Sequence, residues 1–133
     1  MTDNRKMEKI LVVDDEPDIT FSLKKVLEEN RFACVDIFND PADVISKYNN
    51  QPGITYDLLI IDILMPRMNG FELYEKIKKI DNNAKVCFIS AYRMYFEALR
   101  EMYPGSEVDC FMNKPFENKD LLRKVQSALT TTN

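Results

Sequence analysis

Polar side chains suited to phosphate or metal chemistry follow four short apolar stretches of the sequence. Each stretch ends on, or is closely followed by, one or two of these residues: Asp14, Asp15, Asp62, Ser90 and Lys114. Carboxylates at close range repel each other unless a proton or a cation intervenes, and their oxygen atoms suit a hard cation such as Mg²⁺. A serine hydroxyl and a lysine ammonium bind phosphate oxygens. Together, these residue types indicate phosphate chemistry that uses carboxylate, hydroxyl and amine groups.

Each of these residues also has a plainer structural interpretation, which stays open at this point. Acids ahead of Pro17 are typical of helix starts, where they satisfy free amides, and this role is compatible with metal binding at Asp14 and Asp15. Serine caps helices, and lysine usually points to solvent. An aspartate at a strand end can be structural. However, Asp62 lies within Leu-Leu-Ile-Ile-Asp-Ile-Leu-Met, where burial of an unpaired charge costs several kcal/mol.

The elements that must position these residues alternate regularly along the chain. Short apolar runs predict strands at 8–13, 32–38, 57–61, 85–89 and 108–112. Apolar residues at helical spacing, with Pro17, Asp40-Pro41 and Asn69 as start signals, predict a helix after each strand. In the third helix, Asn69 and Glu72 form a predicted capping box. Five strand–helix units predict an α/β fold, a doubly wound parallel sheet with helices on both faces.

The polarity of the strands predicts their order in the sheet. Strands one, three and four are almost wholly apolar, as central strands covered on both faces should be. Strands two and five each hold an acid, Asp36 and Asp109, and acids are better tolerated at edges. This favours the order 2-1-3-4-5 of the flavodoxin-like fold. Ligands then bind beyond the carboxyl ends of strands one and three, where Asp14, Asp15 and Asp62 lie.

Bulk properties describe one domain of an ordinary globular protein. The chain has 133 residues and a net charge of −4, and we expect a disordered leader at 1–7, one domain at 8–129 and a tail at 130–133. The mild acidity and the lack of a basic stripe argue against direct nucleic-acid binding. No apolar run is long enough to span a membrane, and no signal peptide is evident, so we expect a cytoplasmic location.

Two residue types narrow the chemistry further. The absence of histidine excludes a phosphohistidine donor within the chain, a histidine-based triad and a zinc site that needs imidazole. The three cysteines lie in apolar stretches without metal-like spacing, and we expect reduced thiols in the core: Cys34, Cys87 and Cys110.

The ordered set of motifs resembles the receiver domain of bacterial and archaeal response regulators. The resemblance rests on Asp14-Asp15, Asp62, Pro66, Gly70, Ser90-Ala91 and Lys114-Pro115, and it covers the chain from Glu8 to Leu129. It implies that Asp62 accepts a phosphoryl group from a sensor histidine kinase or a phosphotransfer protein, in two-component signalling. It also implies that Mg²⁺, with Mn²⁺ as a substitute, is held by Asp14, Asp15, Asp62 and the backbone carbonyl of Leu64.

The resemblance assigns further roles near the phosphate. Ser90, Lys114 and the backbone amide of Ala91 would bind phosphoryl oxygens, while Pro66, Gly70 and Pro115 would support the loops. A conformational switch would involve Ser90 and the aromatic three residues before the lysine, which here is Phe111, although a role in the core is an equal alternative. The face of helix four, strand five and helix five would contact a downstream effector or a second copy of the chain.

Other functions compete with this interpretation. A receiver-like interaction module could keep the fold without being phosphorylated. A small metal-dependent phosphatase could use Asp62 as a transient nucleophile, although Leu64 stands where such enzymes usually carry a second acid. Beyond its own phosphoryl transfer and slow autodephosphorylation, we expect no enzymatic activity. A dinucleotide-binding protein is disfavoured, because the three glycines form no phosphate-cradling loop.

Overall fold

A five-stranded parallel sheet organises the chain in the computed structural model, which describes residues 8–30, 34–102 and 110–130. The strand order is β2-β1-β3-β4-β5, so the predicted flavodoxin-like order 2-1-3-4-5 is confirmed. The strands are β1 (Lys9–Val13), β2 (Cys34–Phe38), β3 (Leu58–Asp62), β4 (Lys85–Ser90) and β5 (Cys110–Asn113). They alternate with α1 (Pro17–Glu29), α2 (Pro41–Asn50), α3 (Gly70–Lys78), α4 (Met94–Met102) and α5 (Asn118–Thr130).

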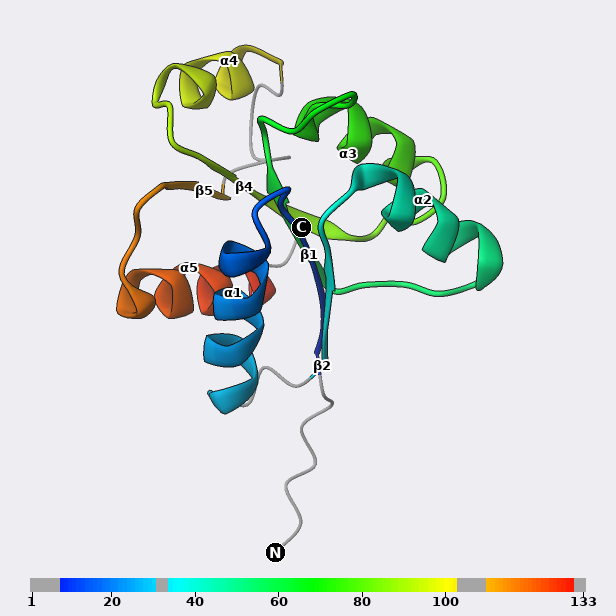
Figure 1. Cartoon of the computed structure of the whole chain (residues 1–133), viewed down its shortest axis with the longest axis horizontal. Helices are drawn as coiled ribbons and strands as arrows, with labels where there is room; N and C mark the ends of the chain where they lie inside the picture. The colour runs from blue at the N-terminus through cyan, green and yellow to red at the C-terminus, as the bar shows by residue number, and fades with distance from the viewer. Residues whose placement is uncertain (1–7, 31–33, 103–109, 131–133) are drawn as a thin grey trace, which may run out of the picture.

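The helices cover both faces of the sheet, as Figure 1 shows. On one face, Leu23 and Leu27 of α1 and Leu121 and Val125 of α5 are buried in a common cluster. On the other face, a second cluster joins apolar residues of α2, α3 and α4: Val44, Tyr48, Phe71, Tyr74, Ile77 and Leu99. The strands between these layers have alternate side chains in the two clusters, which explains their nearly continuous apolar sequences.

Local sequence signals account for most of the helix starts. Asn69 and Glu72 form the predicted capping box, with the Asn69 side chain accepting from the Glu72 amide and the Glu72 side chain accepting from the Asn69 amide. The Asp40 side chain accepts from the Ala42 amide at the start of α2. Pro17 occupies the first turn of α1, where no backbone donor is required.

Several predicted boundaries differ from the structure by one or two residues. Strand β1 begins at Lys9 instead of Glu8, and strand β5, whose predicted start at 108 lies outside the described residues, ends at Asn113 instead of Met112. Thr130, which was predicted to belong to the tail, is the last residue of α5. The predicted leader at 1–7, Asp109 and the rest of the tail lie outside the described residues. None of the helices described is long and apolar enough to cross a membrane.

The prediction of three reduced core thiols is wrong about the oxidation state of Cys87 and Cys110 and about the burial of Cys34. Cys87 of β4 and Cys110 of β5 form a disulfide, and Cys34 is free but exposed on β2. The two bonded residues are 23 positions apart in the sequence, yet they lie directly opposite each other in the register of β4 and β5. Sequence spacing did not reveal this pairing, because it depends on which strands become neighbours in the sheet.

Candidate functional site

Asp62 is the last residue of the central strand β3, and only 3 % of its surface is exposed. The start of α3 packs tightly behind it. A Cβ atom added to Gly70 would lie 2.5 Å from the Asp62 carbonyl oxygen and 2.9 Å from the Ile63 Cα. Only glycine therefore fits at this position without a shift of the backbone that carries Asp62.

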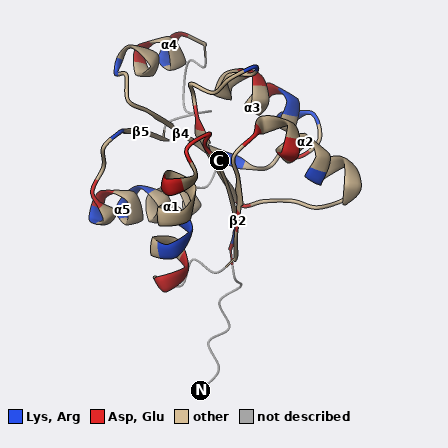
Figure 2. Cartoon of the chain, viewed as in Figure 1, with Lys and Arg blue, Asp and Glu red and all other residues tan. Residues whose placement is uncertain are grey.

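Lys114 brings the two buried aspartates together at the carboxyl edge of the sheet. Its Nζ lies 2.7 Å from Asp14 Oδ2 and 3.4 Å from Asp62 Oδ2. Glu16, at the start of α1, adds a third carboxylate, with its Oε1 3.5 Å from the same ammonium. Acidic positions, drawn in red, gather at the start of α1 in Figure 2. The site thus holds three carboxylates around one cation.

Asp14 is fully buried, and its two oxygen atoms have different surroundings. Its Oδ1 accepts a hydrogen bond from the Glu16 backbone amide at 2.9 Å. Its Oδ2 accepts no hydrogen bond of regular geometry, although it forms the ion pair with Lys114. The N-cap residue of α1 is Glu16, which makes no side-chain capping bond. Asp14 therefore orders the turn before α1 and does not cap the first helical amides.

Burial and mutual repulsion change the ionisation of this group of residues. Burial, followed by the negative charge of Asp14, raises the pKa of Asp62 to about 7, against the opposing effect of Lys114. Burial also raises the pKa of Asp14, again opposed by Lys114. For Lys114, burial lowers the pKa, but the contact with Asp14 and the charges of Asp62 and Glu16 outweigh burial, and the net pKa is raised.

The donor set fits a hard divalent cation. Carboxylate oxygens of Asp14, Asp15 and Glu16 lie within 4.8 Å of one another, and Asp15 and Glu16 are exposed to solvent. The Asp14 oxygen without a regular hydrogen bond is buried beside them. Oxygen-only ligands of this kind suit Mg²⁺ or Mn²⁺. Sequence reasoning selected Asp14 and Asp15 but not Glu16, although Glu16 directly follows them.

Ser90 and Lys114 come to the same edge on neighbouring strands. Ser90 is buried at the end of β4, and its Oγ accepts a hydrogen bond from the Tyr92 amide at 3.0 Å. The Lys114 amide donates to the Ser90 carbonyl oxygen at 2.8 Å, which joins the two strand ends. Ala91, the next residue after Ser90, and Leu64, two residues after Asp62, are both exposed. Asp14, Asp62, Ser90 and Lys114 thus lie along one rim, the end of a parallel sheet where ligands bind.

Phe111 is buried on β5, and β4 separates it from the strand that ends at Asp62. Its ring centroid lies 5.0 Å from that of Phe96 in α4, and its carbonyl oxygen accepts a hydrogen bond from Lys124 of α5. Phe111 is therefore a core residue that joins α4, β5 and α5. This position agrees with the plain core interpretation and leaves its role in a switch as a prediction.

The supporting residues have distinct positions around the rim. The Pro66 carbonyl oxygen accepts from the Met68 amide, and Arg67 between them has a left-handed backbone with φ of 70°. Pro115 follows Lys114 through a cis peptide bond.

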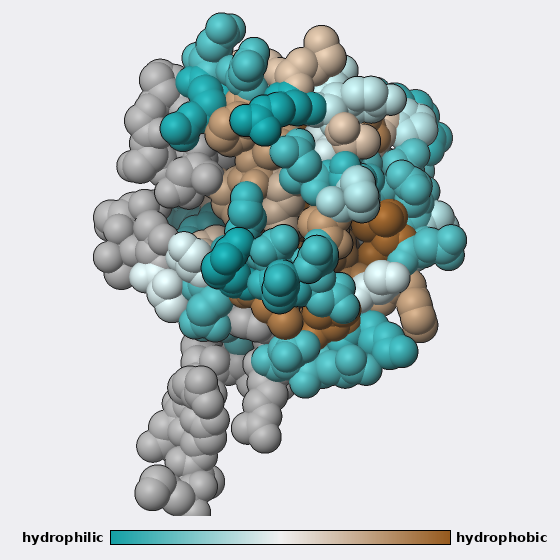
Figure 3. All heavy atoms as spheres, turned by 90° about the vertical axis from the view of Figure 1, so that its left-hand side faces the viewer, coloured by the Kyte–Doolittle hydropathy of each residue, from teal (hydrophilic) through white to brown (hydrophobic). Residues whose placement is uncertain are grey.

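Pro115 also lines a mainly apolar cavity of about 380 Å³ between α1 and α5, which reaches Lys114. Figure 3 shows this side of the molecule, with apolar surface (brown) visible between hydrophilic side chains.

The chain is similar to known proteins over nearly its whole length. The family model described as the response regulator receiver domain matches residues 10–126. The chain is 32 % identical over 122 residues to the chemotaxis protein CheY of Treponema pallidum, covering 91 % of this chain and 82 % of that protein. It is 29 % identical to the CpxR homologue of Haemophilus influenzae, a transcriptional regulatory protein, but spans only 51 % of its length.

Solved structures share the fold over nearly the whole chain. The response regulator protein TrrA of Thermotoga maritima, solved in complex with Mg²⁺-BeF, is 33 % identical, with a TM-score of 0.76. The match covers 92 % of this chain and 100 % of TrrA. CheY of Borrelia burgdorferi, in a complex described as CheX-CheY-BeF3-Mg²⁺, is 28 % identical with a TM-score of 0.77, and the match covers 93 % of this chain and 90 % of that one.

Proposed function

The chain belongs to the response regulator receiver domain family, and from this premise we propose that it is a phosphorylation-operated switch with Asp62 as the phosphoryl acceptor. One observation carries the proposal. Asp62 is a nearly buried carboxylate at the end of the central strand, 3.4 Å from the ammonium of Lys114 and beside a second buried acid, Asp14. Perturbed carboxylates in such a group are candidates for functional residues.

In the proposed reaction, a carboxylate oxygen of Asp62 attacks phosphorus. A new bond forms between this oxygen and phosphorus, and the bond between phosphorus and the donor nitrogen of a phosphohistidine breaks, leaving the electron pair on the donor. Lys114 lies close enough to Asp62 to pair with a phosphoryl oxygen. Ser90 uses its Oγ as an acceptor for the Tyr92 amide, so its hydroxyl proton is a separate donor for the phosphate.

We propose that Asp14, Asp15 and Asp62, with the backbone carbonyl of Leu64, hold Mg²⁺, and we add Glu16 as a further donor. The buried Oδ2 of Asp14 supports this set, since it makes no regular hydrogen bond and its charge is offset only by the ammonium of Lys114, which leaves it able to bind a further cation. When bound, Mg²⁺ or Mn²⁺ supplies positive charge that offsets the negative charge gathered on the phosphoryl oxygens. The chain's own contribution is to hold the carboxylates on one rim and to place Lys114 among them.

The proposed partners are a sensor histidine kinase or a phosphotransfer protein as donor, and an effector or a second copy of the chain as receiver of the signal. The proposed contact face comprises α4, β5 and α5. Exposed side chains support it: Tyr92, Met94 and Met102 are 54 %, 67 % and 51 % exposed. Exposed aromatic and methionine side chains are enriched at interfaces. Phe96 and Phe111 link this face to the strand that leads to Lys114. We further propose a cytoplasmic location and no turnover of external substrates.

Intact-mass spectrometry with a small phosphodonor, such as acetyl phosphate, tests the proposal. We expect one Mg²⁺-dependent phosphoryl adduct on the wild-type chain and none on Asp62→Asn. Asp57→Asn is the matched control, because Asp57 lies just before the other end of β3, where its side chain accepts from the Lys9 amide. An adduct that persists in Asp62→Asn would contradict the assignment of the acceptor.

Two other outcomes identify the competing functions. A folded, Mg²⁺-binding chain that never gains an adduct would indicate an interaction module that works without phosphorylation. Rapid release of phosphate with continued turnover, abolished in Asp62→Asn, would indicate a phosphatase.

A further inference from the structure

The Cys87–Cys110 disulfide joins the two strands that end at Ser90 and lead to Lys114. Cys87 lies opposite Cys110 in the parallel register of β4 and β5, with their Cα atoms 4.5 Å apart, within the range that disulfides use. The same register brings Ser90 opposite Asn113, the residue before Lys114. The bond therefore closes a covalent ring that contains the end of β4, the whole of α4 and the start of β5.

The disulfide also lies beneath a helix. Both cysteines belong to the cluster that contains Leu121 and Val125 of α5, and all four side chains are buried. Protein interiors are close-packed, so a change of volume at one position displaces its neighbours. Two separate thiols need more room than one sulfur–sulfur bond, and α5 is the element that packs over them.

We propose that Cys87 and Cys110 are a reversible redox site, a dithiol–disulfide pair whose oxidation state changes the packing of α5 on β4 and β5. This inference does not depend on the phosphorylation of Asp62. This inference does rest on the proposed cytoplasmic location. In such a reducing compartment, stable structural disulfides are rare, and those that form are usually transient, catalytic or redox-sensing. Cys34 is not part of this redox site, because it is exposed on β2, the edge strand at the opposite end of the sheet order from β5.

The reductant is a dithiol and the oxidant is a low-molecular-weight disulfide. Cys110 is 8 % exposed and Cys87 is fully buried, so the incoming thiolate attacks the sulfur of Cys110. A mixed disulfide forms at Cys110, the Cys87–Cys110 bond breaks, and Cys87 leaves as a thiolate and takes up a proton. The second thiol of the reductant then displaces Cys110. The dithiol has become a disulfide by losing two electrons and two protons, and both cysteines are now thiols. In the reverse reaction, oxidised glutathione takes up two electrons and two protons from the two cysteines and leaves as two molecules of reduced glutathione.

Thiol counting on the folded Cys34→Ser variant of the 133-residue chain is the first test, since this background excludes the exposed thiol. The folded chain is treated with each reagent, the reagent is removed, and iodoacetamide is then added together with denaturant; we expect it to modify no cysteine after oxidised glutathione and two cysteines after dithiothreitol, as read by intact mass. If the number of alkylated cysteines returns to zero after dithiothreitol is exchanged for oxidised glutathione, the oxidation is reversible, as proposed. A disulfide that dithiothreitol opens only in denaturant, or two thiols that never become oxidised, would overturn the proposal.

Hydrogen exchange of the same two states tests the effect on α5. We expect amides of α5 and β5 to exchange roughly threefold or more faster in the dithiol state, whereas α2 and β2 stay unchanged. The variant with Cys87→Ala and Cys110→Ala on the Cys34→Ser background should show no response to either reagent. Equal exchange of α5 in both oxidation states of the cysteine-containing chain would overturn the proposed coupling, and this comparison does not require the alanine variant to fold.

Discussion

Lys114 Nζ lies 2.7 Å from Asp14 Oδ2, closer than its 3.4 Å separation from Asp62. The cation proposed to bind phosphate is thus paired mainly with an acid proposed to bind metal. Only 13 % of the Lys114 side chain is exposed and the Asp14 side chain is buried, so solvent weakens this ion pair less than it would weaken one at the surface. Binding of a divalent cation at Asp14 must compete with this ammonium for the same carboxylate.

Removal of the competing ammonium should therefore strengthen metal binding. We expect Lys114→Ala to raise the affinity for Mg²⁺ by roughly three- to tenfold, because one positive charge leaves a site of several carboxylates. The same variant should gain its phosphoryl adduct more slowly. Isothermal titration calorimetry measures the first effect and intact-mass time courses the second.

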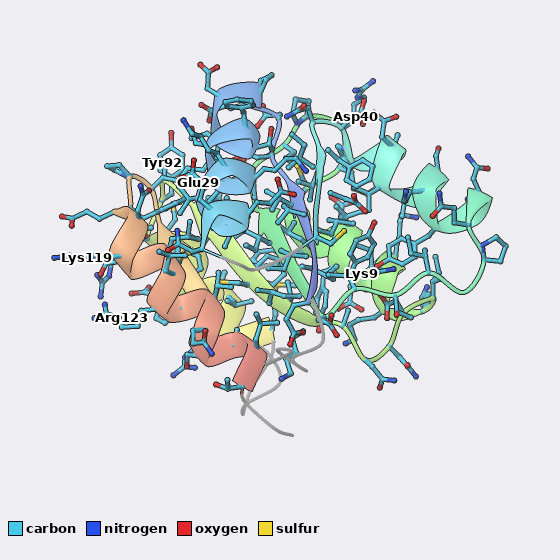
Figure 4. All side chains as sticks on the ribbon, turned by 90° about the horizontal axis from the view of Figure 1, so that it is seen from below. Lys9, Glu29, Asp40, Tyr92, Lys119 and Arg123 are labelled. Carbon is cyan, nitrogen blue, oxygen red and sulfur yellow. A yellow bond between two sulfur atoms is a disulfide. The ribbon has the colours of Figure 1, made fainter. Side chains whose placement is uncertain are left out.

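Lys119→Ala is the control for this experiment, since the Lys119 side chain is 81 % exposed on α5 and points away from the molecule (Figure 4). An unchanged or weaker Mg²⁺ affinity in Lys114→Ala would contradict the idea that the two cations compete.

The raised pKa of Asp62 makes the stability of the metal-free chain depend on pH. The pKa of this carboxyl is about 7 in the folded chain, against 3.8 for an unperturbed aspartate, so the folded state binds more protons between these limits. Stability must then fall as pH rises through this window and level off above it. We expect Asp62→Asn to lose most of this dependence and to be more stable than wild type by roughly 1–3 kcal/mol near pH 8 without divalent cations.

Urea denaturation in the presence of a chelator, at several pH values, measures this difference. Asp57→Asn should retain the wild-type dependence on pH. Parallel curves for wild type and Asp62→Asn would show that Asp62 ionises normally in the folded chain.

Gly70 should not tolerate a side chain, because a Cβ would meet the backbone of Asp62 and Ile63. We expect Gly70→Ala to destabilise the chain by roughly 1–3 kcal/mol and to slow phosphorylation, since the end of β3 must move. Gly53→Ala is the matched control. Gly53 has a φ of +89° but no atom within 4 Å of an added Cβ, so alanine should cost about 1 kcal/mol without affecting phosphorylation. Equal phosphorylation rates for both variants would argue against a role of Gly70 in positioning Asp62.

A buried network at the other end of the sheet should affect stability without affecting the site. Asp81 is buried and accepts hydrogen bonds from the Tyr48 hydroxyl at 2.9 Å and the Tyr56 amide at 3.0 Å. Asp81→Ala would leave both donors without this acceptor, and we expect a loss of roughly 2–4 kcal/mol in the free energy of unfolding.

Phosphorylation of Asp81→Ala at low temperature should match that of wild type while the chain remains folded. Asp18→Ala, an exposed substitution in the first turn of α1, should cost less than about 1 kcal/mol. A loss for Asp81→Ala no larger than that of Asp18→Ala would mean that the network contributes little.

Local and periodic features of the fold could be predicted from the sequence. The capping box at Asn69 and Glu72 needs only residues three positions apart, and the apolar face of α1 repeats at helical spacing. The strand order followed from which strands are wholly apolar, because central strands are buried on both faces. Boundaries were less certain, as at Thr130, since helix ends depend on weak, competing bonds.

Features that depend on two distant segments could not be predicted in the same way. The Cys87–Cys110 pairing, the Asp81 network and the preference of Lys114 for Asp14 each join residues at least 23 positions apart. Glu16 was visible as an acid, but only the distance to Lys114 shows that it faces the site. Such contacts arise from side-chain directions that residue types alone do not specify.

The sequence by itself determined the alternation of strands and helices, the order of the sheet and the set of polar residues that follow its strands. These properties depend on hydrophobic periodicity and on the rule that parallel strands place their carboxyl ends at one edge. Only the tertiary structure decided how those residues interact there: which acid pairs with Lys114, how far burial raises the pKa of Asp62, and that Cys87 meets Cys110. Electrostatic and covalent pairing act over a few ångströms, and that proximity is set by packing of the whole chain.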